Sequence, residues 1–466
     1  MANGETRILE SFKNIFAIPE LRNRILFMLA MLAVYRVGSW IPTPGVDATA
    51  LEEFFTSQAG GSLVGFLDLF TGGNLRRFSI FAQGIMPYIT ASIILQLLTI
   101  VWPYLERLSK EGELGRKKIT QYTRYLTIVL SVFQSLATAF FLEQTSISAN
   151  QPIVLNPGLG FKLLTILTLT TGTAFIMWLG EQISERGIGN GISLIIFAGI
   201  VAGLPDGVAW MIKKVTDGAL IQVLVLVALM VVVIAFVVFV ERGQRKIPIQ
   251  YAKRMVGRKV YGGQSTFLPL RVNAGGVIPI IFAASLLALP QTLKFMVKAS
   301  WMEKISEQLS HGYPLYILFY ALGIIFFTFF YVGIIYNPNE VADNIRKFGG
   351  SIPGIRPGKP TAELIDKIMT RMTFAAGIYL VVVSLLPDFL ISGIRVAAFP
   401  WVGDWLHDSL PEFITQGLGV TFYFGGTSLL IVVGVAMDTV NQIESQLIMR
   451  HYDGFLKRGR IRGRRG

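Results

Sequence analysis

The residues that usually carry chemistry are sparse in this sequence and stand mostly outside its apolar stretches. No cysteine is present, which excludes disulfides, thiolate metal sites and cysteine nucleophiles. The three histidines, His311, His407 and His451, are too few and too scattered for a histidine-built metal centre. Within the apolar stretches we find no acid–base pair, nucleophile–base pair or phosphate-binding loop. We therefore expect no enzymatic activity, no cofactor and no metal.

A few polar side chains do lie within the apolar stretches. Arg36 is about 7 Å of helix rise from the end of its stretch, so its side chain can reach the surface. Gln83, Gln134 and Gln222 also lie within the stretches; hydrogen bonding between helices is the simplest structural role for such side chains, and we favour it for Gln134 and Gln222. Gln96 lies well inside an interrupted stretch and is the better functional candidate.

Two long polar segments separate the apolar stretches and carry most of the remaining chemistry. Segment 241–274 has eight basic residues and one acid, interleaved with aromatic residues. Segment 337–372 has six basic and four acidic residues, and it presents Arg356 between proline and glycine on both sides. A stiff loop with one guanidinium suits contact with a phosphate or a carboxylate. Both segments therefore fit either structured RNA or a protein partner.

The composition identifies a protein that crosses a membrane many times. Hydrophobic residues make up 52% of the chain and charged residues 15%, whereas soluble proteins carry about 25% charged residues. A helical span needs about 20 mostly apolar residues. We predict ten spans, at approximately 25–41, 78–101, 122–142, 161–180, 191–204, 219–240, 275–290, 314–336, 373–393 and 418–441.

The distribution of lysine and arginine orients these spans. Segments on the side of the N-terminus hold 32 of the 42 basic residues: 1–24, 102–124, 182–190, 241–274, 337–372 and 442–466. Loops rich in lysine and arginine stay in the cytosol. We therefore expect both termini and both polar segments to face the cytosol.

Ten spans divide into two halves of five, and an odd number per half inverts the second half relative to the first. The second spans of the two halves resemble each other, since GIMPYITAS at 84–92 aligns with GVIPIIFAA at 276–284. The shared glycine and proline weaken the start of each helix. Such interrupted spans are typical of the moving elements of transport proteins. We predict halves at 1–204 and 205–441 and a basic tail at 442–466.

A glycine-bracketed segment precedes the second span. Residues 60–73 form a short amphipathic stretch that is too short to cross the membrane and begins on the outer side. Backbone at membrane depth must be covered by protein or water. We interpret this stretch as a hinged re-entrant piece.

Several motifs along the chain make it resemble the SecY family of bacterial protein-conducting channel subunits. They are FAQGIMPYI at 81–89, ERGIGNG at 185–191, YAKR at 251–254, QST at 264–266, PGIRPG at 353–358 and YFGGTS at 423–428. Gln83 departs from the leucine associated with its place in the family, and the outer loop 143–162 is family-variable.

The resemblance implies an all-helical clamshell of two inverted five-helix halves around an hourglass pore. An apolar collar would close the waist by excluding water, carried here by Ile85, Ile89, Ile192, Ile196, Ile281 and Ile431. The plug in the outer funnel would span about 63–77, with Leu63, Phe66, Leu67, Phe70 and Arg77. The lateral gate toward lipid would include Thr90, Gln96, Asn273 and Phe282.

The resemblance also implies the binding partners and the function of the chain. The cytosolic segments would dock the SecA motor or the ribosome, through its 23S RNA and exit-site proteins, with Lys253, Arg254, Arg258, Lys259 and Arg356. SecE and SecG would be membrane partners, and signal peptides, nascent chains and membrane lipids would meet the channel. The expected function is translocation of unfolded secretory chains across the bacterial cytoplasmic membrane and lateral insertion of membrane proteins.

Two other functions share some of these features. A secondary transporter of a small solute would also have inverted halves and broken helices, but it should place an ionisable residue or polar cluster at mid-membrane. None is found in the predicted spans. A non-conducting membrane scaffold or insertase is the third class, which conductance in the presence of a stalled secretory chain would distinguish from a channel.

Overall fold

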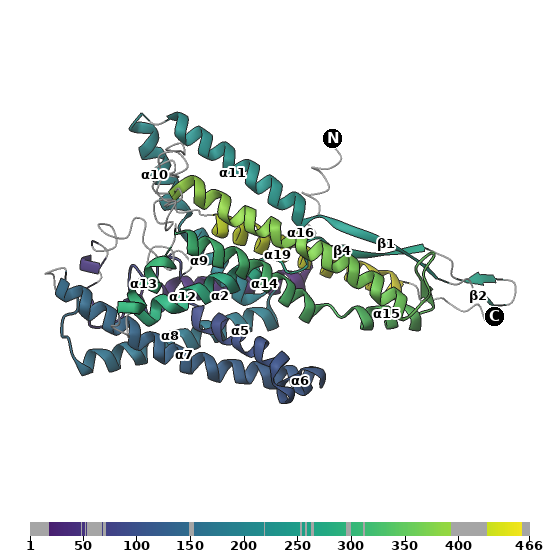
Figure 1. The fold of residues 1–466 in the computed structure, drawn as a ribbon, viewed down its shortest axis with the longest axis horizontal. Helices are drawn as coiled ribbons and strands as arrows, with labels where there is room; N and C mark the ends of the chain where they lie inside the picture. Colours follow the sequence, from purple (N-terminus) through teal and green to yellow (C-terminus); the bar gives the residue numbers. More distant parts are fainter. Residues whose placement is uncertain are drawn as a thin grey trace. The chain divides into compact units, whose positions relative to one another are not determined.

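The computed structural model describes residues 18–47, 49–51, 53, 68, 71–148, 153–218, 220–251, 254–256, 259–261, 265–294, 300–310, 313–392 and 426–458. The chain, whose helices and strands are labelled in Figure 1, forms two compact units. The first comprises Met1–Pro205 and Val435–Gly466, and the second comprises Asp206–Gly434. Each unit is described by itself.

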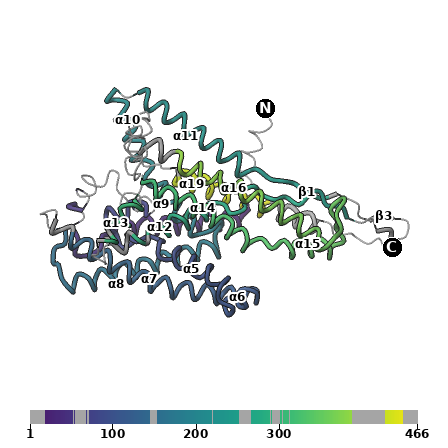
Figure 2. The backbone as a smooth tube through the Cα atoms, in the orientation of Figure 1, coloured from purple at the N-terminus to yellow at the C-terminus, as the bar shows by residue number. Residues whose placement is uncertain are grey.

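Helices build the first unit. They are α2 (Pro19–Gly38), α5 (Met86–Val101), α6 (Pro103–Lys110), α7 (Glu113–Ser148), α8 (Leu159–Arg186), α9 (Gly191–Ala202) and the C-terminal part of α19 (Gly426–Arg458). The long helices α7 and α8 run side by side (Figure 2). Near one end, Lys162 Nζ lies 3.1 Å from Glu143 Oε2; near the other, Arg124 Nε donates to Glu181 Oε1 at 2.7 Å.

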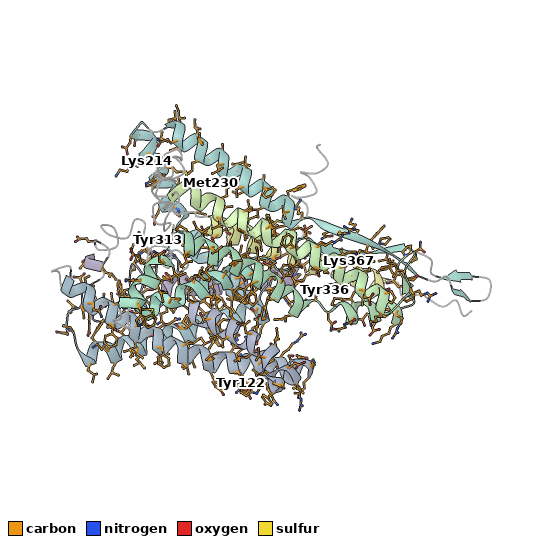
Figure 3. All side chains as sticks on the ribbon, in the orientation of Figure 1. Tyr122, Lys214, Met230, Tyr313, Tyr336 and Lys367 are labelled. Carbon is orange, nitrogen blue, oxygen red and sulfur yellow. The ribbon has the colours of Figure 1, made fainter. Side chains whose placement is uncertain are left out.

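Helix α10 (Leu204–Thr216) leads from the first unit into the second. Beyond it, the second unit contains α11 (Leu220–Glu241), α12 (Ile278–Lys294), α13 (Ser300–Gln308), α14 (Pro314–Ile335), α15 (Pro338–Lys347), α16 (Lys359–Ser392) and the start of α19. Helix α14 packs on α12 and on α16. Met230 marks the course of α11 in Figure 3, and Lys367 marks that of α16.

The polar segment 241–274 contains strands, so the expectation of an all-helical chain is wrong here. Strand β1 (Gln244–Tyr251) pairs antiparallel with β4 (Ser265–Arg271), from Gln244 opposite Arg271 to Gln250 opposite Ser265. The short strands β2 (Arg254–Val256) and β3 (Lys259–Tyr261) pair beyond them, and β5 (Gly350–Ser351) adds to β1. Apolar residues alternate along β1, so Ile247 and Ile249 face a core with Leu270, Ile345 and Ile365.

Six helical stretches in the described part of the chain are long and apolar enough to cross a membrane: 113–144, 159–186, 191–216, 220–241, 314–347 and 359–386. The pair α5 and α6, bent by 98°, makes a possible seventh, and α12 contains a shorter apolar helix, Ile278–Ala288. The bend lies at Pro103, which lacks the N–H that a continuous helix needs. The number of ten spans stays a prediction.

Two predicted span starts need correction. The second span was expected from 78, but the helix begins at Met86; the seventh was expected from 275, but the helix begins at Ile278. Backbone turns precede both helices, and each contains a glycine with positive φ. The ninth predicted span, 373–393, lies within the longer α16.

Candidate functional site

The second span of each half begins with the same backbone hinge. Gly84 has φ +56° and Gly276 has φ +58°, a conformation that side chains with a Cβ rarely adopt. Each glycine is followed after two residues by the first helical residue and after three by a proline in the first turn. The motif shared by 84–92 and 276–284 therefore produces the same local structure twice, once in each unit.

Three of the predicted collar residues lie within five residues after these glycines in the sequence. In the first unit, Ile85 caps the start of α5 and Ile89 lies one turn further, and both are buried. In the second unit, Ile281 occupies the place on α12 that Ile89 has on α5, and it is also buried. Val277 stands where Ile85 does and is buried too, although the sequence did not single it out.

Two other collar residues lie on α9, which has its own cap. Asn190 Oδ1 accepts from the backbone N–H of Ile192 at 3.1 Å, and this fixes the first turn of the helix. Ile192 packs against Gly180 of α8, where an added Cβ would lie 3.2 Å from Ile192 Cγ1. Ile196, one turn along, is buried.

The last collar residue, Ile431, lies on the part of α19 that belongs to the second unit, and it is fully buried. One turn further, Gly434 leaves room for Val277, since an added Cβ would lie 2.4 Å from Val277 Cγ1. Within the second unit, α19 therefore approaches the α12 hinge closely.

The predicted plug is only partly within the described residues. Leu63, Phe66, Leu67 and Phe70 lie outside them. Arg77 is described, and its guanidinium carbon lies 4.0 Å from the centre of the Trp40 ring, a cation–π contact.

Residues 71–77, here called the anchor segment, are tied to α2 by hydrogen bonds. Tyr35 Oη donates to the Thr71 carbonyl at 3.2 Å, and Asn74 Nδ2 donates to Tyr35 Oη at 3.1 Å. The ring of Tyr35 also stacks on Phe81 at 5.7 Å. The contact with Tyr35 is buried, so the anchor segment is held to α2 by groups shielded from solvent.

The anchor segment also meets α9 backbone to backbone. Gly72 has φ +73°, and an added Cβ there would lie 2.5 Å from the Cα of Gly199. The buried carboxylate of Asp68, three residues before the segment, accepts from the Arg76 backbone N–H at 2.8 Å. The residues of the predicted plug that lead toward α5 are therefore packed into the first unit.

The predicted gate residues on α5 make local bonds within the first unit. The hydroxyl of Thr90 donates to the Met86 carbonyl at 3.0 Å, and Gln96 Nε2 donates to Ser92 Oγ at 3.0 Å. Gln96 remains partly exposed.

The predicted gate residues of the second unit surround the α12 hinge. Asn273 Nδ2 donates to Glu241 Oε1 at 2.6 Å and to the Gly276 carbonyl at 3.1 Å, so it ties the hinge to the end of α11. Phe282 packs edge-on against Phe327 of α14 at 5.7 Å. Asn273 and Phe282 are both buried.

Three of the predicted docking residues are described: Arg254 and Lys259, which lie between β1 and β4 in the sequence, and Arg356, which lies in the loop before α16. Arg254 stands on β2 and Lys259 on β3, whereas Lys253 and Arg258 lie outside the described residues. The Arg356 side chain is exposed in a turn flanked by Gly354 and Gly358, with φ +80° and +104°. Thr361 Oγ1 holds this turn by donating to the Arg356 carbonyl at 2.9 Å.

Comparison with known proteins decides the family. The model of the SecY family matches residues 79–440. The chain is 48% identical over 452 residues to "Protein translocase subunit SecY" of Escherichia coli strain K12, covering 96% of each chain. It is 43% identical over 465 residues to the protein of the same name from Thermotoga maritima, covering 98% of this chain and 100% of that one.

The chain belongs to the SecY family.

Solved structures match the fold of this SecY-family chain. "The structure of a protein conducting channel" aligns with a TM-score of 0.61 and 18% identity, over 91% of this chain and 92% of the other. "Sec61 in the Canine ribosome-channel complex from the endoplasmic reticulum" aligns with a TM-score of 0.56 and 16% identity, with the same coverage. The chain is therefore a mostly helical, multi-pass membrane protein with the SecY and Sec61 fold.

Sequence reasoning missed the polar contacts that hold the anchor segment and the start of α5 in this SecY-family chain. Tyr35 and Asn74 bind each other from positions 39 residues apart. Gln83 lies among the polar residues of the apolar stretches and departs from the family pattern, but the sequence does not show which helices it bonds, namely α7 and α8. Their separation along the chain leaves no local pattern from which the pairing could be predicted.

Proposed function

We propose that this chain is the channel subunit that conducts unfolded secretory proteins across the bacterial cytoplasmic membrane and releases membrane proteins sideways into lipid. The matched hinges carry the proposal, because they place Ile89 and Ile281 at equivalent buried positions in two units. The relatives named as protein translocase subunits and the neighbours titled as protein-conducting channels support it.

In this proposal the two halves, 1–204 and 205–441, are inverted five-helix bundles around an hourglass pore. The six collar isoleucines form the waist, where an apolar ring excludes water and ions until a chain passes. Isoleucine makes no directional bonds, so such a ring does not discriminate among the side chains of the passing polypeptide. The plug, about 63–77, occupies the outer funnel.

The lateral gate then lies between α5 with α7 on one half and α12 with α14 on the other. Thr90 and Gln96 stand on the first pair of helices, and Asn273 and Phe282 stand at or on the second. Signal peptides and membrane lipids would meet the channel there.

The partners follow from the polar segments and from the relatives. The exposed Arg356 and four basic residues of segment 241–274, Lys253, Arg254, Arg258 and Lys259, form the docking surface for SecA or for ribosomal RNA and exit-site proteins. A matched solved structure titled as a ribosome-bound Ssh1 complex supports the ribosome as a partner. SecE and SecG complete the membrane complex, with both termini of this chain in the cytosol.

Conductance and translocation test the channel together. Reconstituted complex carrying Ile89→Ser and Ile281→Ser should leak ions at rest and should still translocate, because the apolar seal is lost while the path remains. Ile221→Ser is the matched control, since Ile221 is 77% exposed on α11. A collar variant that folds but shows no increase in ion leak would contradict the sealing role of the collar isoleucines. Uptake of a small solute without protein translocation would favour a transporter.

A further inference from the structure

The side chain of Gln83 reaches from the turn before α5 into the packed surfaces of α7 and α8. Its Nε2 donates to Ser135 Oγ at 2.9 Å and to the Ser131 carbonyl at 3.3 Å. Its Oε1 accepts from Ser131 Oγ at 2.8 Å and from Thr173 Oγ1 at 3.2 Å. Ser131 and Ser135 belong to α7 and Thr173 to α8, so one amide joins three parts of the first unit.

This amide uses its full hydrogen-bonding capacity. A glutamine side chain offers two N–H donors and one oxygen with two lone pairs, and all four are engaged here. Ser131, Ser135 and Thr173 are almost completely buried. A polar group placed among apolar helices is costly unless it is satisfied in this way, so these four bonds offset the cost of burying the amide.

The residues next to Gln83 in the sequence are also closely packed against neighbouring helices. An added Cβ on Gly172 of α8 would lie 1.9 Å from the Ile80 carbonyl oxygen, so the two backbones are in direct contact. The Phe81 ring stacks on Tyr35 at 5.7 Å and on Phe175 at 6.0 Å. Gln83 stands immediately before the Gly84 hinge and two residues before Ile85.

We propose that Gln83 is a positioning residue that ties the collar end of α5 to α7 and α8 and so sets the resting position of Ile85 and Ile89. The proposal rests on the proposed function, in which these isoleucines seal the pore. With the amide intact, the first turn of α5 moves together with α7 and α8. Without it, α5 pivots at Gly84 independently, and the seal and the discrimination between good and defective signal peptides both weaken.

Gln83→Leu tests this in the reconstituted complex, because leucine fills similar space without the four bonds. We expect resting ion conductance to rise about tenfold, the ratio that corresponds to one net hydrogen bond in a closed–open equilibrium. Precursors with defective signal peptides should be translocated more readily. Gln121→Leu is the matched control, because Gln121 bonds only at the exposed surface of α7, to Tyr125 Oη at 2.8 Å.

A second variant separates positioning from stability. Gln83→Leu combined with Ser131→Ala and Ser135→Ala removes the two α7 hydroxyls left without the amide, so the melting temperature should recover in part while the leak and the relaxed selectivity persist. Ser135→Ala alone gives a weaker form of the same change if Gln83→Leu does not express. Conductance and selectivity like the parent in Gln83→Leu, or recovery of both with the melting temperature in the triple variant, would overturn the proposal.

The collar variants run in the same assay keep the two proposals apart. If Ile89→Ser with Ile281→Ser leaks and the Gln83 variants do not, the positioning role alone is wrong. If the collar variants also stay tight, the sealing function proposed for the isoleucines is wrong.

Discussion

Removal of the Tyr35 hydroxyl is a clean perturbation of the anchor segment. Tyr35→Phe keeps the ring that stacks on Phe81 and deletes only one oxygen. That oxygen donates to the Thr71 carbonyl and accepts from Asn74 Nδ2. The exposed fraction of Tyr35 is 2% and that of Asn74 is 1%, so water does not readily replace the lost partner.

The expected size of the effect follows from these contacts. A buried donor or acceptor left without its partner costs about 1–3 kcal/mol. If the segment leaves α2 when the channel opens, this cost falls on the closed state alone, and the closed-to-open ratio should drop about 5- to 150-fold. The stacking on Phe81 is retained, so the packing contribution to stability should change little.

Resting ion conductance of the reconstituted complex measures this ratio, and a thermal melt measures stability. We expect Tyr35→Phe and Asn74→Ala to raise conductance, and the double variant to add little to Tyr35→Phe, because Tyr35→Phe already breaks the bond between Asn74 and Tyr35. Tyr125→Phe is the control, since Tyr125 is 57% exposed on α7. A lower melting temperature with unchanged conductance would refute the reasoning, because it would show that these bonds persist in the open state.

Three further predictions concern single contacts. Arg356→Lys, →Ala and →Glu should each express normally and lower translocation about ten- to hundredfold, since a charge-assisted hydrogen bond is worth about 1.5–3 kcal/mol; normal activity in all three would leave Arg356 without a partner role. Gly72→Ala should lower the melting temperature more than Gly73→Ala, because both have positive φ but only Gly72 meets backbone; equal shifts would show that the α9 contact relaxes. Lys162→Met should destabilise the protein more than Lys110→Met, because the Lys162–Glu143 pair is the less exposed; the reverse order in thermal melts would contradict this.

The hinges could be predicted from the sequence because their signal is local. A glycine followed three residues later by a proline indicates a weakened helix start, and this pattern occurs at Gly84 and at Gly276. In the structure Gly84 and Gly276 have φ of +56° and +58°, and each helix begins two residues later. The error lay in the upstream limit: apolar residues such as Ile80 and Phe81 were counted as helix, although they form turns packed against α8.

The β1–β4 hairpin was missed because its prolines argue against strands. Backbone groups of alternate residues in an antiparallel strand point to opposite sides. Val272 N–H donates to the Gly243 carbonyl, so the residues of β4 that face β1 include Leu270 and Leu268. Pro269 lies at the alternate position, where a missing N–H costs no bond of the ladder. The sequence shows the proline but not the side to which its nitrogen points.

The two hinges share a backbone conformation but are held by different polar groups, and this has a mechanical consequence. Helices in a membrane associate through close van der Waals packing and interhelical hydrogen bonds, so the polar bonds at each hinge add to the packing that holds it. At the first hinge, Gln83 binds α7 and α8. At the second, Asn273 binds the last residue of α11 and the hinge carbonyl itself. The first hinge is thus tied to two neighbouring helices, and the second to the end of one helix. We therefore expect α12 to pivot more freely than α5, so that Asn273→Leu should change the resting seal less than Gln83→Leu.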